Sequence, residues 1–200
     1  MSDPTNIAGT EVRLLVERPD GWSVLPVHPD APSVLLVGAD KVSLHSAVRQ
    51  NVGDVGEGLL LEVVAGALSP RLLAVPHAGQ GRLHVNGQPA PVVALLRAKD
   101  VFYFEHSDAA FHVTTFHRVR IGQADPSQVG KECPVCRSAL TAESRVLTCP
   151  CGTGIHLADD EAGLRCALAI RSCPACGRKI ELEDSYSFLP EGFPPEEVAA

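Results

Sequence analysis

Hydrophobic residues in the first 121 positions fall into short runs that are separated by polar and turn-forming residues. The runs are rich in valine, leucine and phenylalanine, which favour β-strands. In the last run, His117, Val119 and Ile121 alternate with Arg118 and Arg120, which is the period of a strand with one face in water. We predict strands at residues 12–16, 33–37, 59–64, 71–75, 82–85, 92–96, 101–105 and 111–121. Many short strands at this spacing predict an antiparallel all-β sandwich.

Length and charge narrow the possible functions. A chain of 200 residues is long enough for one medium domain or two small ones. A formal net charge of −7 without a basic patch argues against nucleic-acid binding. The first residues lack the features of a secretory signal, and no uncharged apolar run approaches the roughly eighteen residues that span a bilayer. We therefore expect a cytoplasmic protein that binds neither nucleic acid nor membranes.

The cysteines are confined to one region. All seven lie between Cys133 and Cys176, and the first 132 residues contain none. An odd number, close local pairs and the missing export signal argue against disulfide bonds. With one histidine they make eight ligands, enough for two tetrahedral zinc sites, and thiolates with an imidazole select zinc over hard cations. The set is Cys133, Cys136, Cys149, Cys151, His156, Cys166, Cys173 and Cys176.

Two other chemistries use such cysteines. A thioredoxin-type redox pair needs a low-pKa thiolate at a helix start inside an α/β unit, and the sequence predicts none. A catalytic zinc needs an open coordination position, and eight ligands on two ions leave none. The segment 133–176 has no aromatic residue and too few aliphatic ones to fold without a metal. We expect two structural Zn²⁺ ions, no catalytic residue and no other cofactor.

Composition also predicts how the chain is divided. Residues 122–130 are polar, contain glycine and proline, and lack a hydrophobic period, which is typical of a linker. From residue 190 onward, three prolines and three glutamates predict a loose tail. We expect a sandwich at 1–124, a linker at 125–130, a zinc domain at 131–189 and a tail at 190–200. No internal repeat is apparent.

Part of the sandwich resembles a known family. Residues 82–91 (RLHVNGQPAP) and 95–104 (LLRAKDVFYF) are similar to the end of a forkhead-associated domain. Some members of that family bind phosphothreonine through a Gly-Arg pair and a Ser-x-x-His motif. Here Gly38 is followed by Ala39, and Ser43 and His45 are one residue too close together. Because phosphate recognition needs correctly placed donors, we expect the fold without phosphopeptide binding, and a phosphothreonine reader is the alternative.

The cysteine region resembles a second family. Four cysteines, one histidine and three cysteines in this order resemble RING-type cross-brace fingers, and residues 146–156 (VLTCPCGTGIH) resemble prokaryotic RING-like fingers. In such fingers the first and third ligand pairs hold one zinc ion, and the second and fourth pairs hold the other. The resemblance implies one site of Cys133, Cys136, His156 and Cys166, and another of Cys149, Cys151, Cys173 and Cys176.

The spacing before the eighth ligand departs from the family pattern. Nine residues separate His156 from Cys166, where two are usual. Asp159 stands at the short spacing and is the alternative to Cys166. We prefer Cys166 because a thiolate is the better zinc donor.

The finger resemblance implies a function. RING-type fingers are ubiquitin-ligase modules that hold a charged conjugating enzyme in a productive orientation and form no covalent bond to the modifier. The docking surface is a shallow apolar groove, for which the matching residues are Val135, Leu168, Ile170 and Pro174. Arg178, with Lys179 second, matches a cationic residue that bridges enzyme and modifier.

A sandwich followed by such a finger resembles bacterial proteins of ubiquitin-like conjugation systems. We therefore expect a ligase-like adaptor, in which the sandwich binds a protein substrate, a partner or a second copy of the chain. The alternative is a zinc-stabilised scaffold or protein-interaction module that catalyses nothing.

Overall fold

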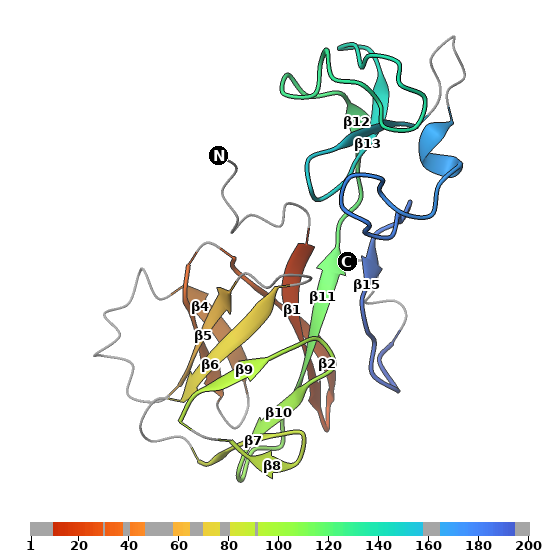
Figure 1. Ribbon diagram of the computed structural model, residues 1–200. Helices are drawn as coiled ribbons and strands as arrows, with labels where there is room; N and C mark the ends of the chain where they lie inside the picture. Colours follow the sequence, from red (N-terminus) through yellow and green to blue (C-terminus); the bar gives the residue numbers. More distant parts are fainter. Residues whose placement is uncertain are drawn as a thin grey trace. The chain divides into compact units, whose positions relative to one another are not determined.

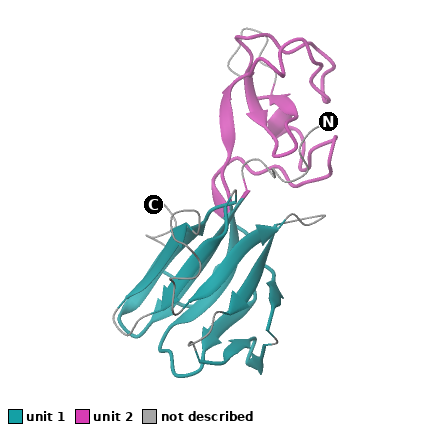
Figure 2. Cartoon of the chain, turned by 90° about the vertical axis from the view of Figure 1, so that its left-hand side faces the viewer, with its two compact units in different colours: residues 1–6, 11–116, 186–200 teal, residues 7–10, 117–185 magenta. Residues whose placement is uncertain are grey.

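The computed structural model describes residues 10–29, 31–37, 41–46, 58–64, 70–76, 81–90, 92–157 and 165–194 (Figure 1). These ranges contain β-strands and one short 3-10 helix, η3 (Cys166–Leu168). No helix within them has the length and hydrophobicity needed to cross a membrane. The chain divides into two compact units, coloured separately in Figure 2. Unit 1 comprises residues 11–116 and the segment from residue 186, and the main part of unit 2 is residues 117–185.

One sheet of unit 1 has five antiparallel strands in the order β4-β3-β5-β6-β9. The strands are β3 (Ser33–Val37), β4 (Val42–Ser46), β5 (Leu59–Val64), β6 (Arg71–Pro76) and β9 (Ala94–Leu96). The strands predicted at 33–37 and 59–64 match β3 and β5 at both ends, because runs composed mostly of aliphatic residues mark them. The β4 strand lies outside the predicted runs, since serine and histidine interrupt its apolar residues.

The other sheet of unit 1 has the order β2-β1-β11-β10-β7-β8. Its strands are β1 (Thr10–Arg18), β2 (Gly21–Val27), β7 (Leu83–Val85), β8 (Gln88–Pro89), β10 (Val101–Phe104) and β11 (Ala110–His117). The β1 and β2 strands form a hairpin in which Val12 lies opposite Val27 and Arg18 opposite Gly21. The predicted runs omit β2, whose solvent-facing residues include serine and proline.

The two sheets enclose one hydrophobic core, so the predicted sandwich is confirmed. Phe102 and Phe111 are fully buried and stack with their ring centroids 4.8 Å apart. Leu35, Leu59 and Leu72 contribute from the five-stranded sheet, and none of them is exposed to solvent. Alternating residues on each strand therefore form the core, as the period of two predicts.

The segment after residue 185 completes unit 1. The β15 strand (Ser185–Tyr186) pairs with β11. The Ser187 backbone N–H donates to the Thr115 carbonyl oxygen at 2.8 Å, and Phe193 packs edge-on against Trp22. Phe193 is only 9% exposed. Residues 186–194 thus belong to the sandwich and not to a loose tail beginning at 190, and unit 2 is inserted in the sequence between β11 and β15.

The strand predicted at 111–121 is two strands. The β11 strand ends at His117 and belongs to unit 1 up to residue 116, while β12 (Arg120–Gln123) belongs to unit 2. Between them, the carboxylate of Asp184 accepts a hydrogen bond from the Val119 backbone N–H at 2.6 Å. The alternation of polar and apolar residues continues across this break, so the pattern alone does not reveal it. The division of the chain therefore falls at residue 117, earlier than the predicted linker.

Unit 2 contains a three-stranded antiparallel sheet in the order β12-β13-β14, with β13 (Arg145–Thr148) and β14 (Gly154–His156). The residues predicted as a linker, 125–130, pack within this unit. Gln128 is 1% exposed, and its side-chain amide donates to the Thr148 hydroxyl at 3.2 Å and to the Gly152 carbonyl at 3.1 Å. A glycine- and proline-containing segment is here part of a folded unit.

Candidate metal centres

Two short loops of unit 2 have the same backbone geometry. In the first loop, residues 131–140, the Cys133 N–H donates to the Ser138 carbonyl at 2.9 Å, and the Arg137 N–H donates to the Cys133 carbonyl at 2.9 Å. In the second loop, residues 171–180, Cys173 and Gly177 make the equivalent bonds at 2.7 and 2.8 Å. We call these loops knuckle 1 and knuckle 2.

Each knuckle turns its two cysteines towards the same side. An isolated β-bridge closes each loop, Glu132 to Ala139 in knuckle 1 and Ser172 to Lys179 in knuckle 2. The residue after the second cysteine has positive φ in both, 68° at Arg137 and 74° at Gly177. The knuckles are therefore a local structural repeat. The sequence hides it because the two loops share little beyond Cys-Pro-x-Cys.

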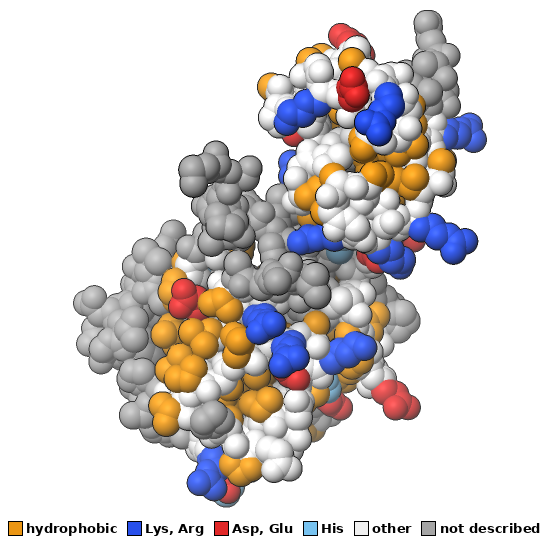
Figure 3. Space-filling model, in the orientation of Figure 1, with side chains coloured by type: hydrophobic (Ala, Val, Ile, Leu, Met, Phe, Trp, Pro, Cys, Tyr) orange, Lys and Arg blue, Asp and Glu red, His pale blue; other side chains and the backbone are white. Residues whose placement is uncertain are grey.

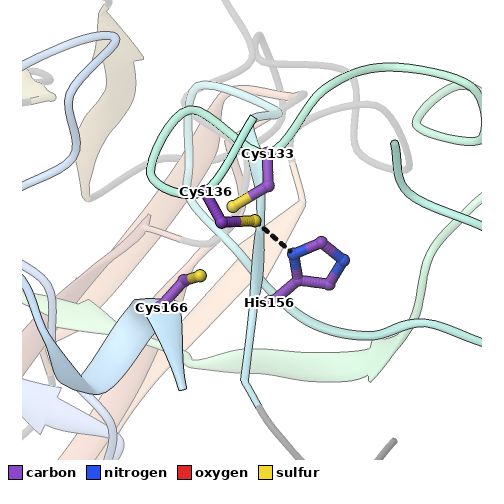
Figure 4. Close-up of side chains that lie close together, drawn as sticks. All are labelled: Cys133, Cys136, His156 and Cys166. Atoms are coloured by element: carbon purple, nitrogen blue, oxygen red, sulfur yellow. Dashed lines mark hydrogen bonds between the residues drawn. The ribbon is translucent and has the colours of Figure 1, made fainter. Parts of the chain in front are cut away.

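The first cluster joins knuckle 1 to two distant segments (Figure 4). Cys133 and Cys136 come from the knuckle, His156 from the end of β14, and Cys166 from the start of η3. The four ligand atoms lie within 4.8 Å of one another. The imidazole faces the cluster through Nδ1, which is 3.3 Å from the Cys136 Sγ.

The second cluster joins knuckle 2 to the turn between β13 and β14. Cys149 and Cys151 come from the turn, Cys173 and Cys176 from the knuckle, and their sulfur atoms lie within 4.8 Å of one another. Gly152, with φ of 85°, lets the turn close so that its N–H donates to the Cys149 carbonyl at 2.8 Å. Gln128 holds this turn through the Gly152 carbonyl.

The sulfur spacing in the second cluster suits a tetrahedral metal ion. Zinc bonds to sulfur at about 2.3 Å, so two thiolates on one tetrahedral ion lie about 3.8 Å apart. The Cys149 and Cys176 Sγ atoms are 3.7 Å apart, and those of Cys151 and Cys173 are 3.8 Å apart. These distances are far longer than a disulfide bond, and all seven cysteines are free. Both clusters can therefore hold a metal ion, and their donors are the soft ones that zinc prefers.

Electrostatics favours a cation in the first cluster. Burial, with the neighbouring Cys136 thiol, raises the pKa of Cys166 to about 12. Burial also acts to raise the pKa of Cys136, but hydrogen bonds with the backbone and side chain of Ser138 and with His156 outweigh it and lower that pKa to about 6. The Cys136 thiol thus loses its proton more readily than the neighbouring Cys166 thiol. A divalent ion would stabilise all the thiolates together.

The clusters differ in their exposure to solvent. In the first cluster three ligands are buried and Cys136 is half-buried, whereas Cys151 and Cys176 of the second cluster are exposed. Four of the ligand cysteines, Cys133, Cys149, Cys166 and Cys173, also form part of the hydrophobic core of unit 2. Metal ligation and packing therefore occupy the same small interior.

The structure places the remaining finger residues as follows. Asp159 lies outside the described residues, whereas Cys166 has its sulfur in the first cluster. Leu168 is 53% exposed on η3, Pro174 is exposed, and Val135 and Ile170 are half-buried against the core of unit 2. Arg178 is half-buried in knuckle 2, and Lys179 is exposed next to it. Gln128 was not predicted, because one glutamine in a polar segment carries no signal.

The possible phosphopeptide residues of unit 1 are partly described. The Ser43 hydroxyl and the His45 Nε2 atom lie 2.9 Å apart on β4 and bond to each other. Gly38 and Ala39 lie outside the described residues.

Comparisons with known proteins give a limited result. No model of a known protein family matches the chain, and no curated protein matches it. One solved structure, titled "Rv0020c_FHA Structure", aligns with 53% of this chain and 93% of that chain, at 16% sequence identity and a TM-score of 0.35. The two metal clusters and the all-β sandwich thus stand on the geometry of the chain itself.

Proposed function

We propose that unit 2 is a zinc-loaded, RING-like finger that recruits a charged conjugating enzyme and promotes transfer of a ubiquitin-like modifier. The observation that supports this most directly is the interleaving of the ligands. Cysteines 133 and 136 share a cluster with His156 and Cys166, while the intervening pair at 149 and 151 joins Cys173 and Cys176. This is the cross-brace order of RING-type fingers, which the sequence resembles.

Zinc in both clusters accounts for the stability of unit 2. Apart from the ligand cysteines, the buried hydrophobic core that the described residues of this unit form is Ala124, Leu140, Val146, Leu147, Ile155 and Ala167. A core of this size is too small for independent stability, whereas a structural zinc ion contributes on the order of 10–16 kcal/mol at neutral pH. With four protein ligands on each ion, neither metal has a position for a reacting water.

The activity we propose depends on docking. Among the described residues of unit 2, Leu168 is the most exposed large apolar side chain, at 53%, and it follows Cys166 by two residues. Val135 belongs to knuckle 1 and Pro174 to knuckle 2, so a docking surface that uses both would require both clusters to be intact. Arg178 supplies a cation within knuckle 2. By holding the enzyme-bound thioester in an orientation open to attack, such a surface lowers the entropic part of the barrier without a nucleophile of its own.

The test is discharge of the thioester. A panel of ubiquitin-type conjugating enzymes, each charged with its modifier, is mixed with the zinc-loaded chain and with free lysine as acceptor. We expect faster discharge for the cognate enzyme and loss of that stimulation in Leu168→Arg. Val129→Arg is the matched control, because Val129 is an apolar residue of unit 2 that is 43% exposed and outside the proposed surface.

The zinc-stabilised interaction module is the competing function, and it shares all the ligands. It is favoured if no enzyme of the panel is stimulated, or if the Leu168→Arg and Val129→Arg proteins behave alike while both retain two zinc ions.

A further inference from the structure

Solvent reaches the ligands of the second cluster more easily than those of the first. The first cluster has three buried ligands and one half-buried ligand, Cys136. In the second cluster, Cys149 and Cys173 are 2% and 1% exposed and belong to the hydrophobic core of unit 2. Cys151 and Cys176 are exposed and lie outside that core. Figure 3, in which cysteine is coloured with the hydrophobic residues, shows side chains of that class gathered on the surface of unit 2.

Each exposed cysteine of the second cluster lies next to a buried cysteine of the other segment. The Sγ atom of Cys176, in knuckle 2, is 3.7 Å from that of Cys149, in the turn between β13 and β14. The Sγ atom of Cys151, in the turn, is 3.8 Å from that of Cys173, in knuckle 2. Because a disulfide bond is about 2.0 Å long, either pair can close when its sulfur atoms approach each other by less than about 2 Å.

Bound zinc would make these sulfur atoms reactive. A cysteine that ligates a metal is deprotonated, and the thiolate is the form of cysteine that acts as a nucleophile. Susceptibility to oxidation follows thiolate character and exposure. Since zinc gives both clusters thiolate character, exposure distinguishes them, and it selects Cys151 and Cys176. The first cluster also has only three oxidisable thiolates, because His156 supplies its fourth ligand.

We propose that the second cluster is a site of reversible oxidation by peroxides, from which zinc is released while the first cluster keeps its ion. The thiolate of Cys151 or Cys176 attacks one oxygen of hydrogen peroxide, becomes a sulfenic acid and releases hydroxide. The thiolate of the buried partner then attacks the sulfenic sulfur, forms the S–S bond and expels a second hydroxide. Two thiolates are thus oxidised to one disulfide, and one peroxide is reduced to two hydroxide ions, which take two protons from the solvent and become water.

Each disulfide removes two thiolate ligands from the ion. One disulfide leaves the zinc ion with two protein ligands, and the second disulfide leaves it with none. The expected products, Cys149–Cys176 and Cys151–Cys173, both connect the turn to knuckle 2, so covalent bonds replace the metal as the link between these segments. This inference rests on the zinc occupancy proposed above and does not depend on the ligase activity, which the thioester assay measures separately.

The first experiment follows zinc release. The zinc-loaded full chain is treated with hydrogen peroxide in the presence of a zinc-binding dye, and one of the two ions is expected to leave at least about tenfold faster than the other. Samples taken after the fast phase are alkylated and digested. Peptide mass spectrometry is expected to find the two disulfides named above, with Cys133, Cys136 and Cys166 still reduced. A dithiol reductant and added zinc are expected to restore two ions per chain, since disulfides and sulfenic acids are reversible products.

Histidine substitutions test the role of the exposed pair. The double variant Cys151→His/Cys176→His keeps four zinc donors in the second cluster and removes both exposed thiolates, so the fast phase is expected to disappear. Cys136→His, at the half-buried ligand of the first cluster, is the matched control and is expected to keep the fast phase. Circular dichroism and zinc content show that each variant is folded and loaded. If the double variant does not hold two ions, the disulfides mapped in the wild-type chain decide.

Three results would overturn the proposal: both ions leaving together, oxidation of the first cluster before the second, or a loaded chain that resists peroxide at both clusters. None of these affects the function proposed for unit 2. A wild-type chain that binds no zinc would overturn both.

Discussion

The hydroxyl of Tyr186 accepts a hydrogen bond from the Arg13 Nη1 atom at 2.8 Å, although 173 positions separate the two residues in sequence. Arg13 is 6% exposed, and its guanidinium also lies 3.7 Å above the centre of the Phe116 ring. The charge of Arg13 is further paired with Glu11 at 3.1 Å. This cluster joins β1, β11 and β15, and it anchors the segment that follows unit 2 to the sandwich.

Replacing Tyr186 with phenylalanine is expected to destabilise unit 1 by about 1–2 kcal/mol, because a partly buried hydrogen bond from a charged donor is lost while the ring remains. Urea unfolding followed by Trp22 fluorescence measures this. Tyr103→Phe is the matched control, since the other tyrosine of the chain stacks on His84 with ring centroids 5.0 Å apart and its hydroxyl has no hydrogen-bond partner among the described residues. Equal losses in the two variants would contradict the role of the Arg13 bond.

Ending the chain after Ser185 is expected to lower the stability of unit 1 by more than the single substitution does. The truncation removes the β15 pairing, the Ser187 bonds to Thr115 and the contact of Phe193 with Trp22. Large buried aromatic residues contribute about 3–5 kcal/mol when they are truncated to alanine. Zinc content is expected to stay unchanged, because all eight ligands remain. A truncated chain as stable as the full one would show that residues 186–194 are dispensable.

Removing the metal is expected to unfold unit 2 and leave unit 1 folded. Residues 117–185 contain no tryptophan, tyrosine or phenylalanine, so the near-ultraviolet signals report unit 1 alone. After a strong chelator is added, Trp22 fluorescence is expected to persist while trypsin cuts at Arg137 and Arg145. If the Trp22 fluorescence instead changed to that of the unfolded chain as trypsin cleavage began, the two units would unfold as one.

Cys166→Ser is expected to lower the zinc content from two ions per chain to one, because three ligands remain in the first cluster. Asp159→Ala is the matched control and is expected to keep both ions. Elemental analysis of the purified proteins decides between them, and the reverse result would make Asp159 the eighth ligand.

Gly154→Ala is expected to destabilise unit 2 by about 1–3 kcal/mol through overpacking. A Cβ atom there would lie 2.8 Å from the Leu140 Cδ1 atom and 3.2 Å from the Gln128 side-chain carbon. Gly122→Ala is the matched control, because a Cβ at that residue of β12 meets nothing within 4 Å. The rate of zinc transfer to a chelating dye measures the difference, with a faster rate expected only for Gly154→Ala.

Residue patterns predict the interior of this molecule well and its boundaries poorly. Apolar runs such as β3 and β5 are recognisable because most of their residues are aliphatic and at least partly buried. The break after His117 is not recognisable, since alternation continues through Val119 while the chain passes from one unit to the other. Tertiary contacts such as the Asp184 bond to Val119 produce that break, and no local pattern encodes a contact over 65 positions.

The metal clusters are a different case. Cysteine spacing within each knuckle is local chemistry, so both pairs are visible in the sequence. Which pair meets which depends on the fold, and only the family resemblance predicted the interleaving now seen in the ligand positions. Gln128 and the return of Phe193 to Trp22 could not be predicted, because a single glutamine or phenylalanine does not indicate which distant residue it contacts.

The insertion of unit 2 between β11 and β15 has a consequence for biosynthesis. A ribosome delivers the strands of the sandwich first, yet Tyr186 and Phe193 emerge only after the whole cysteine-rich unit has been made. Until then the nascent sandwich exposes Trp22 and Phe116, the aromatic residues that this segment later contacts. Domains that fold during synthesis usually do so from the N-terminus onward. Here the N-terminal unit is completed last, so the unfinished sandwich is open to misassembly for as long as unit 2 is being synthesised.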